Sequence, residues 1–226
     1  MQPASTERRS VAADRRQVTV MFCDLVGSTL LSERLDPEEW REVLGAYQAA
    51  CRQTIEHFGG HIAKYLGDGL LVFFGYPIAH EDDVPRSLHT GLGILQAVQQ
   101  LGSRLGQPLQ VRIGIHTGLV VAGEVGNDAL DIVGTTPHIA ARLQTLAQPG
   151  SLVASAETCQ LASGLFTTVS LGPQTLRGVS EPISVYRIVE EREARHPLES
   201  AARTGLTPLT GREQEASLLL ERWEQV

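Results

Sequence analysis

The segment from residue 60 to residue 75, GHIAKYLGDGLLVFFG, constrains the fold of this chain more than any other. Two runs of strand-forming residues are separated here by Gly67-Asp68-Gly69, and glycine tolerates the positive φ angles of a tight turn. The segment therefore predicts a β-hairpin that holds the Asp68 carboxylate at its tip. Taken alone, Gly-Asp-Gly is more often a turn former with no further role, so other residues must decide whether Asp68 has one.

Lys64 stands in the first strand of this hairpin, where alternation predicts that Ile62, Lys64 and Leu66 lie on one face. It is the only lysine among the 19 Lys and Arg residues of the chain. Lysine is a compact point donor and arginine a planar fork, so a site that needs a single short donor cannot exchange one for the other. This choice of residue indicates a binding role, although a single lysine can also arise by chance.

A second carboxylate, Asp24, ends a strongly apolar strand predicted at residues 17–24, QVTVMFCD. Leu25 and Val26 follow it, and then come Gly27, Ser28 and Thr29. A carboxylate at a strand end, followed by a glycine-containing turn and hydroxyls, suits a phosphate or metal site. The alternative is that Asp24 caps a helix in the segment after it.

Periodicity and turn signals give the other elements. Asp36-Pro37 predicts the start of a long helix, and His80 and His89 are expected to be ordinary residues of a second one. The remaining expected elements are a hairpin of 110–118 with 119–126, a strand at 131–134, a helix from 135 or 136, a strand at 151–154, a helix at 156–161, and strands at 166–171 and 183–189. This βαββαβ order with a C-terminal extension predicts an α+β fold with a ferredoxin-like core, a mixed or antiparallel sheet, and helices on one face.

Composition excludes several classes of protein. The net charge is −7 and no basic cluster is interleaved with aromatic residues, so no nucleic-acid or membrane partner is expected. Cys23, Cys51 and Cys159 have neither metal-ligand nor disulfide-framework spacing, which is typical of a reducing compartment. No apolar stretch approaches the ~18 residues that span a bilayer. The sequence therefore predicts a soluble, cytoplasmic protein.

Four segments are expected along the chain. Residues 1–14 are predicted to be a disordered tail, 15–190 one domain, 191–206 a charged linker, and 207–226 the start of a further module. The sequence stops before any phosphate-loop motif follows, so the natural protein is expected to be longer.

Four motifs in register resemble the class III nucleotide cyclase catalytic domain. They are VMFCDLVGST at 20–29, KYLGDG at 64–69, RIGIHTG at 112–118 and DIVG at 131–134, and the match runs from about Arg16 to Val189. The resemblance is to bacterial enzymes of the adenylate type and implies conversion of ATP to 3′,5′-cyclic AMP and pyrophosphate. The segment after the linker resembles the start of the ATPase modules that follow such domains in some bacterial regulators.

The resemblance implies two divalent cations, Mg²⁺ or Mn²⁺, held by Asp24 and Asp68 with the Leu25 carbonyl as a further oxygen. Such cations lower the pKa of the ribose 3′-hydroxyl and neutralise the phosphates. Two facing carboxylates repel by about 4 kcal/mol at ~4 Å in an effective dielectric of ~20, so the pair needs cations or protons between them. Hard oxygen ligands fit magnesium or manganese and not zinc.

Lys64 and Asp131 match the family positions that read the base. An ammonium donor and a carboxylate acceptor are complementary to adenine N1 and the 6-amino group, whereas guanine presents the opposite pattern. A site so mismatched discriminates by several kcal/mol, so the pair predicts ATP over GTP. Taken alone, Asp131 is equally well explained as a strand-end or loop acid.

Other matched positions concern the triphosphate and the transition state. Arg112 and Arg177 match residues that contact the triphosphate, together with the turn and hydroxyls of residues 27–29. Arg142 matches the arginine that stabilises developing charge. His138 stands where the family usually has an asparagine that positions the ribose, and this departure puts orientation and turnover in doubt.

In this family the metal pair comes from one protomer and the base-reading and transition-state residues from the other, so the resemblance implies a homodimer with two equivalent sites. Two alternatives stay open. One is a catalytically weak or silent module that binds nucleotide or dimerises and regulates a downstream segment, which His138 favours. The other is a different nucleotidyl transferase on a similar core, such as a cyclic dinucleotide synthase, which Lys64 and Asp131 disfavour.

Overall fold

The computed structural model describes residues 14–124, 130–162 and 164–192, all of which belong to one unit of the chain. The first thirteen residues of the expected tail, residues 193–206 of the expected linker and the whole segment 207–226 lie outside the described residues. The boundaries predicted for these segments therefore stay predictions.

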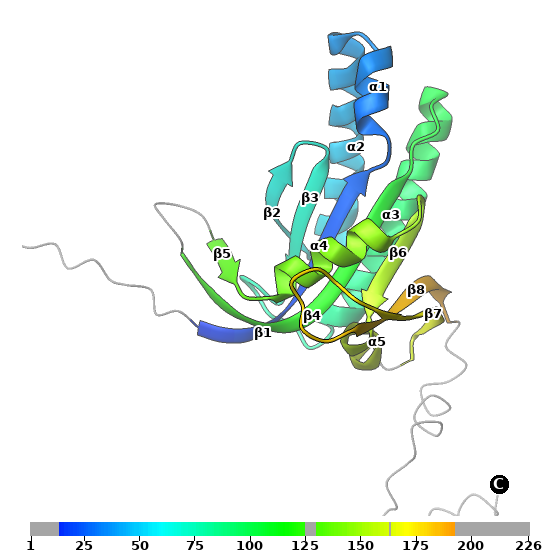
Figure 1. The fold of residues 1–226 in the computed structure, drawn as a ribbon. Helices are drawn as coiled ribbons and strands as arrows, with labels where there is room; N and C mark the ends of the chain where they lie inside the picture. Colours follow the sequence, from blue (N-terminus) through cyan, green and yellow to red (C-terminus); the bar gives the residue numbers. More distant parts are fainter. Residues whose placement is uncertain (1–13, 125–129, 163, 193–226) are drawn as a thin grey trace, which may run out of the picture. The chain divides into compact units, whose positions relative to one another are not determined.

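An eight-stranded mixed sheet forms the centre of the domain, in the order β2-β3-β1-β4-β6-β8-β7 with β5 paired to β4 (Figure 1). The strands are β1 (Asp14–Leu25), β2 (His61–Leu66), β3 (Gly69–Phe74), β4 (Val111–Glu124), β5 (Leu130–Val133), β6 (Ser151–Ser155), β7 (Phe166–Gln174) and β8 (Ile183–Glu191). The order β2-β3-β1-β4, with helices after β1 and β3, is the split βαβ arrangement of a ferredoxin-like core. The predicted α+β fold with a C-terminal extension is confirmed.

Five helices connect the strands of the described residues. They are α1 (Ser28–Arg34), α2 (Pro37–His57), α3 (Asp83–Leu105), α4 (Thr136–Leu146) and α5 (Ala156–Leu161). The start of α2 is confirmed at Asp36, whose side chain accepts hydrogen bonds from the backbone N–H groups of Glu38 and Glu39, each at 2.9 Å. Within the described part of the chain, none of the helices combines the length and the apolarity that crossing a membrane requires.

The helices cover both faces of the sheet, so the expectation that they share one face is wrong. Helices α2 and α3 bury residues such as Tyr47 and Ile94 against β1 and β3 in the largest apolar cluster. Helix α4 lies on the opposite face (Figure 1), where Ala140 and Leu143 are buried in two further apolar clusters. Because α2 and α3 already occupy one face, the apolar stripe of α4 can be buried only on the other.

Strand β4 is one long strand and not the hairpin expected at residues 110–126. Gly118, the last residue of the first strand in the expected hairpin, is extended and pairs with Val18 of β1. A Cβ atom at this position would lie 2.7 Å from Oγ1 of Thr136, so the glycine admits the start of α4 and does not turn the chain. The hairpin partner of β4 is β5, in which Val133 pairs with Val121.

A β-bulge in β2 changes which residues share a face. Ile62 pairs with Val72 and Lys64 with Leu71, so Ala63 is the extra residue. Side chains of directly paired residues lie on the same face, and adjacent pairs alternate. The prediction that Ile62 and Lys64 share a face is therefore wrong: Ile62 packs into the α2–α3 cluster, and Lys64 lies on the face of Leu71 and α4.

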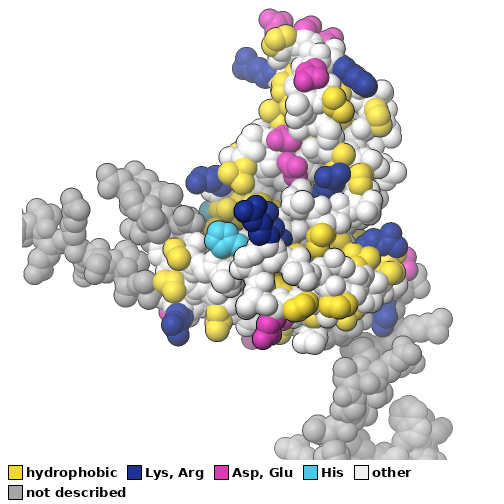
Figure 2. Space-filling view, in the orientation of Figure 1, with side chains coloured by type: hydrophobic (Ala, Val, Ile, Leu, Met, Phe, Trp, Pro, Cys, Tyr) yellow, Lys and Arg dark blue, Asp and Glu magenta, His cyan; other side chains and the backbone are white. Residues whose placement is uncertain are grey.

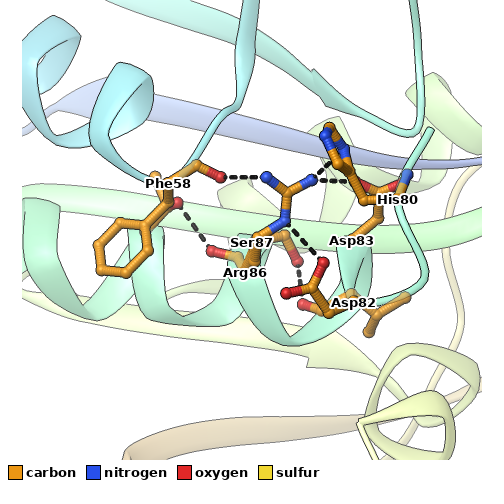
Figure 3. Close-up of polar contacts among 8 residues, drawn as sticks. Phe58, His80, Asp82, Asp83, Arg86 and Ser87 are labelled. Carbon is orange, nitrogen blue, oxygen red and sulfur yellow. Dashed lines mark hydrogen bonds and ion pairs between the residues drawn. The ribbon is translucent and has the colours of Figure 1, made fainter. Parts of the chain in front are cut away.

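Arg86 ties α3 to the end of α2 and to the loop before α3 (Figure 3). Its guanidinium donates to the Phe58 carbonyl oxygen at 2.8 Å and to Asp83, and it lies 3.1 Å from a carboxylate oxygen of Asp82. His80 does not belong to the helix, contrary to expectation: its ring also contacts Arg86 and its backbone N–H donates to Asp83 at 2.8 Å. This cluster satisfies the carbonyl at the end of α2 and the charges at the start of α3.

Candidate active site

Asp24 and Asp68 lie together at one end of the sheet. Asp24 is the penultimate residue of β1 and pairs with Gly69 of β3 on one side and with Arg112 of β4 on the other. Asp68 occupies the turn between β2 and β3, immediately before Gly69. A Cβ atom on Gly69 would lie only 3.4 Å from Oδ1 of Asp24, so the Asp24 carboxylate extends over the strand end beside this turn.

The alternative that Asp24 caps a helix is not supported. The residue at the N-cap of α1 is Gly27, and no side chain makes a capping hydrogen bond there. Ser28 and Thr29 are the first residues of α1, and Leu25, the last residue of β1, has a buried side chain. The Asp24 carboxylate therefore does not cap α1.

The electrostatics of the pair are unfavourable for two negative charges. Burial raises the pKa of the Asp24 carboxyl, and the neighbouring Asp68 carboxylate raises it further, whereas Arg112 and the side chain of Gln144 lower it. The pKa of Asp24 is raised on balance, so Arg112 and Gln144 offset the cost of its negative charge only in part.

Arg112 lies beside Asp24 but forms no ion pair within 4.0 Å among the described residues. Its half-buried side chain has a buried Nε atom with no hydrogen-bond partner there. An unpartnered buried donor next to a pair of carboxylates is costly unless something else occupies it. Arg112 therefore has donor capacity available for an anionic ligand.

The turn that carries Asp68 is held from the other face of the sheet. Nε2 of Gln48, on α2, donates to the carbonyl oxygen of Gly67 at 3.2 Å, and Gly67 has a positive φ of 70°. The hairpin with a glycine turn is thus confirmed, with the positive φ angle at Gly67 and not at Gly69, which begins β3.

Lys64 is exposed on the face of the sheet that contains Asp24. It pairs with Leu71, which pairs with Phe22 of β1, two residues before Asp24. Strand β3 lies between them, so the two backbones are roughly 10 Å apart. Lys64 and Asp24 can therefore contact different parts of one extended ligand.

Helix α4 presents His138 and Arg142 to solvent. The two residues are one helical turn apart and share the outer face of α4. Figure 2 shows a histidine and basic side chains close together over α4, with acidic side chains nearby. The structure therefore assembles charged and titratable groups on the α4 face of the sheet.

Two predicted residues are not brought to this cluster by any described contact. Arg177 is exposed in the connection between β7 and β8. Asp131 lies in β5, where its backbone pairs with Gly123, and its side chain lies outside the described residues. The roles expected for both residues stay predictions.

Sequence reasoning missed the two glutamines. Gln48 supports the Asp68 turn and Gln144 approaches Asp24, but neither has a motif or a charge that distinguishes it from the surface glutamines of the chain. The positions follow from how α2 and α4 sit on the sheet. No signal in the sequence alone could have identified them.

The donor set fits a hard divalent cation. No group of three or more His, Cys, Asp or Glu side chains gathers as a metal site within the part of the chain that the structure describes. The pKa of Asp24 is raised by burial and then by the Asp68 carboxylate, and such a pair of carboxylates matches magnesium or manganese. These cations are bound by one or two carboxylates together with phosphate oxygens and water. Among the side chains that the structure describes, the pair is not joined by the histidine and cysteine ligands that zinc favours.

Comparisons with solved structures agree with the fold. The adenylyl cyclase CyaB from P. aeruginosa is similar with a TM-score of 0.77 and 29% identity, over 80% of this chain and 97% of that chain. The guanylyl cyclase Cya2 is similar with a TM-score of 0.75 and 31% identity, over 81% of this chain and 97% of that chain.

Comparisons of sequence define the family. The family described as Adenylate and Guanylate cyclase catalytic domain matches residues 11–190, and this chain belongs to it. The adenylate cyclase of Anabaena cylindrica is 32% identical over 146 residues, which cover 60% of this chain and 28% of that protein. The chain spans 21% of the length of one curated relative and 35% of another, so it corresponds to a part of these proteins.

Proposed function

We propose that this domain is an adenylate cyclase, which converts ATP to 3′,5′-cyclic AMP and pyrophosphate. The observation that carries the proposal is the facing pair of Asp24 and Asp68, which burial and repulsion leave in need of positive charge. These two residues and the Leu25 carbonyl would hold two divalent cations, Mg²⁺ or Mn²⁺. When bound, the cations would lower the pKa of the 3′-hydroxyl and neutralise phosphate charge.

Lys64 and Asp131 would select the base. Lys64 is exposed on the Asp24 face, where its ammonium can donate to adenine N1. The Asp131 carboxylate would accept from the 6-amino group. Because CyaB and Cya2 are similar to this chain to nearly the same degree, the preference for ATP depends on these two residues and not on overall likeness.

Arg112 would bind the triphosphate beside the carboxylates, through the donor capacity that its unpartnered Nε indicates. Arg177 and the turn of Gly27, Ser28 and Thr29 would contribute further phosphate contacts. These assignments follow the family pattern, and for Arg112 the structure supplies an independent reason.

The geometry of α4 supports a homodimer. Gln144 approaches Asp24, and Arg142 lies about 200° around the helix from Gln144 because successive residues are about 100° apart. Arg142 and His138 therefore face away from the carboxylates of their own protomer. A second copy would bring them to the site, His138 to orient the ribose and Arg142 to stabilise charge in the transition state.

A silent nucleotide-binding or dimerisation module is the second candidate, and the observation that favours it is His138 in the place of the family's asparagine. We further propose that residues 15–190 form the catalytic unit of a cytoplasmic regulator, in which 207–226 begins a further module of the ATPase type. The proposals for these outer segments follow the sequence alone.

The decisive experiment measures cyclic AMP from ATP and cyclic GMP from GTP with Mn²⁺, at several protein concentrations. We expect cyclic AMP as the main product, with specific activity that rises with concentration because the site needs two copies. Metal-dependent ATP binding without product would overturn the enzyme and favour the silent module. In that case His138→Asn would show whether this position alone prevents turnover.

Base selection has its own test in Lys64→Glu. A carboxylate in place of the ammonium suits the protonated N1 of guanine, so the ratio of GTP to ATP activity should rise by about tenfold. The control is Lys64→Met, which removes the donor without adding an acceptor and should lower ATP activity without gain for GTP. An unchanged ratio in Lys64→Glu would show that Lys64 does not contact the base.

A further inference from the structure

Two side chains of the proposed site, Lys64 and Asp68, belong to the β2–β3 hairpin. Among the described strands, β2 pairs with β3 alone and so lies at the edge of the sheet (Figure 1). An edge strand has a partner on one side only, and the bulge at Ala63 interrupts that ladder just before Lys64. The position of the hairpin tip therefore depends on support from outside the sheet.

Helix α2 supplies this support through two side-chain hydrogen bonds. Nε2 of Gln48 donates to the carbonyl oxygen of Gly67 at 3.2 Å. One helical turn further on, Nε of Arg52 donates to the hydroxyl oxygen of Tyr65 at 3.0 Å. The Arg52 guanidinium also lies over the Tyr65 ring, 5.7 Å from its centre. The two contacts are thus one turn apart on α2 and two residues apart on the hairpin.

Each contact lies next to a different ligand group of the proposed site. Gly67 directly precedes Asp68 and has a positive φ of 70°, so its peptide helps to set the direction of the Asp68 side chain. Tyr65 directly follows Lys64 and pairs with Leu70, which is buried in the α2–α3 cluster. Because adjacent strand residues point to opposite faces, holding Tyr65 on the α2 face directs Lys64 to the other.

Helix α2 is firmly fixed where it carries these two donors. Tyr47 and Cys51 are fully buried in the α2–α3 cluster, and each directly precedes one of the donors, Gln48 and Arg52. The start of the helix is held by the capping box at Asp36. The two donors therefore relate the hairpin tip to the core of the domain, and not to another mobile surface element.

We propose that Gln48 and Arg52 are positioning residues of the proposed active site. From α2, Gln48 fixes the turn that directs Asp68 toward a divalent cation. Arg52 acts through Tyr65 to direct Lys64 toward the base. The inference rests on the proposed function, since it assumes these roles for Asp68 and Lys64. Gln48 is half-buried and Arg52 is exposed, so we expect effects of about fivefold, as for single hydrogen bonds near the surface.

The role of Gln48 is tested by Mn²⁺ binding to the full 226-residue chain, measured by calorimetry without nucleotide. Gln48→Met keeps the length and the helix propensity of glutamine but cannot donate. We expect the dissociation constant for Mn²⁺ to rise about fivefold, with the melting temperature of the metal-free protein close to that of wild type. The matched control is Gln53→Met, exposed on the same helix, which should bind like wild type.

The role of Arg52 is tested by binding of 3′-deoxy-ATP and 3′-deoxy-GTP at saturating Mn²⁺. Both nucleotides lack the reacting hydroxyl, so binding is measured without turnover. Tyr65→Phe removes the oxygen that accepts from Arg52 and keeps the ring. The preference for 3′-deoxy-ATP should fall about fivefold in Tyr65→Phe and in Arg52→Met, and Arg52→Lys, which keeps a donor, should lie nearer wild type. The double variant should match Arg52→Met, because both changes remove the same hydrogen bond.

The two readouts together separate positioning from general damage to the hairpin. Gln48→Met should keep the base preference of wild type, and Tyr65→Phe should keep its Mn²⁺ affinity, because each contact lies next to a different ligand group. Equal losses of both properties in every variant would show a generally loosened hairpin and would overturn the two positioning roles.

The outcomes also distinguish this inference from the proposed function. Mn²⁺ binding that Asp68→Ala abolishes, combined with wild-type values in Gln48→Met and Arg52→Met, would overturn the positioning roles and leave the proposed function standing. Absence of Mn²⁺ binding in the wild type, or binding that survives Asp68→Ala, would overturn the cation site and the role of Gln48 with it. Equal wild-type affinity for the two nucleotides would overturn base selection by Lys64 and the role of Arg52 with it.

Discussion

Two pairs of carboxylates lie in this domain, and the chain treats them in opposite ways. Asp82 and Asp83 share one arginine, Arg86, which contacts both and also binds a backbone carbonyl (Figure 3). Asp24 and Asp68 face one another with partial compensation, and the pKa of Asp24 is raised by burial and by Asp68. The first pair is held by ion pairs with its own arginine, whereas the charges of the second pair are only partly compensated.

The origin of the two pairs in the sequence explains the difference. Asp82, Asp83 and Arg86 lie within one turn and a half of each other at the start of α3, so the cluster forms with the helix itself. Asp24 and Asp68 are 44 residues apart and meet only when β1 pairs with β3. Holding two negative charges together in this way is unfavourable and is maintained by the packing of the whole sheet, which is typical of functional sites.

The largest expected effect is on activity at the unsatisfied pair. Asp68→Ala should lower kcat/KM for ATP by about 1000-fold, since cation stabilisation is worth several kcal/mol and each 1.36 kcal/mol is tenfold. The melting temperature of the metal-free protein should not fall, because repulsion of Asp24 disappears. Cyclase assays and thermal melts check both parts. A rate within tenfold of wild type would show that Asp68 does not hold a cation.

The next effect is on stability at the satisfied cluster. Arg86→Met should lower the free energy of unfolding by about 2–3 kcal/mol, because Asp83 and the Phe58 carbonyl lose their shared donor in a largely buried place. Urea unfolding at pH 7 measures the loss, and kcat of the folded protein should change little. If Arg86→Met kept the stability of wild type but lost activity, the structural role given to the Arg86 cluster would be wrong.

A smaller effect concerns pH. The pKa of Asp24 is near 3.8 in the unfolded chain and higher in the folded protein, so the folded protein binds this proton more tightly. The free energy of unfolding therefore falls as pH rises from about 3.8 through the raised pKa of Asp24. Asp24→Asn has no carboxyl to titrate at this position and should not lose stability in this way. Its free energy of unfolding, relative to wild type, should therefore increase over this pH range and stay constant at higher pH. Metal-free urea unfolding between pH 4 and pH 8 measures the difference, and Mn²⁺ should reduce it. An advantage that does not vary with pH would contradict the coupling.

The smallest effect is expected at Asp82, whose side chain is 64% exposed, against 13% for Asp83. Asp82→Asn should change the free energy of unfolding by less than about 0.5 kcal/mol, because an exposed ion pair is screened by water. Asp83→Asn is the matched comparison and should cost clearly more. Equal losses in the two variants, measured by urea unfolding, would show that exposure does not rank the partners of Arg86.

The elements that could be predicted from the sequence are those whose signals are local. The start of α2 at Asp36 and the turn at Gly67 depend on residues within one turn of each other. Gly118 was misassigned because a glycine can serve a turn or a close approach, and only the position of Thr136 on a distant helix decides between them. The helix on the second face was missed for a similar reason, since the sequence does not state which face α2 and α3 leave free.

The candidate site divides in the same way. Asp24, Asp68 and Lys64 stand in recognisable motifs, and the structure places all three on one face or at one end of the sheet. Gln144 and the orphaned Nε of Arg112 belong to no pattern, because their environment is created by how closely α4 approaches β4. Residues that support a site are harder to predict than residues that form it. Their role depends on how closely two elements pack in the folded protein, and the residue type alone does not reveal that.

The bulge at Ala63 divides β2 into two halves with opposite phases. From the Gly-Asp-Gly turn back to Lys64, side chains alternate regularly between the two faces of the sheet. At Ile62 and His61, which precede the bulge, each side chain lies on the face opposite to the one that regular alternation predicts. An alignment of related chains that inserts or omits one residue at Ala63 would therefore leave the lysine in place and exchange the core and surface assignments of every position before it. Deleting Ala63 would remove the extra residue and make Ile62 and Lys64 consecutive members of a regular ladder, still opposite Val72 and Leu71. Ile62 would then keep its interior face and Lys64 its own, so the bulge can be lost without exchanging the two faces.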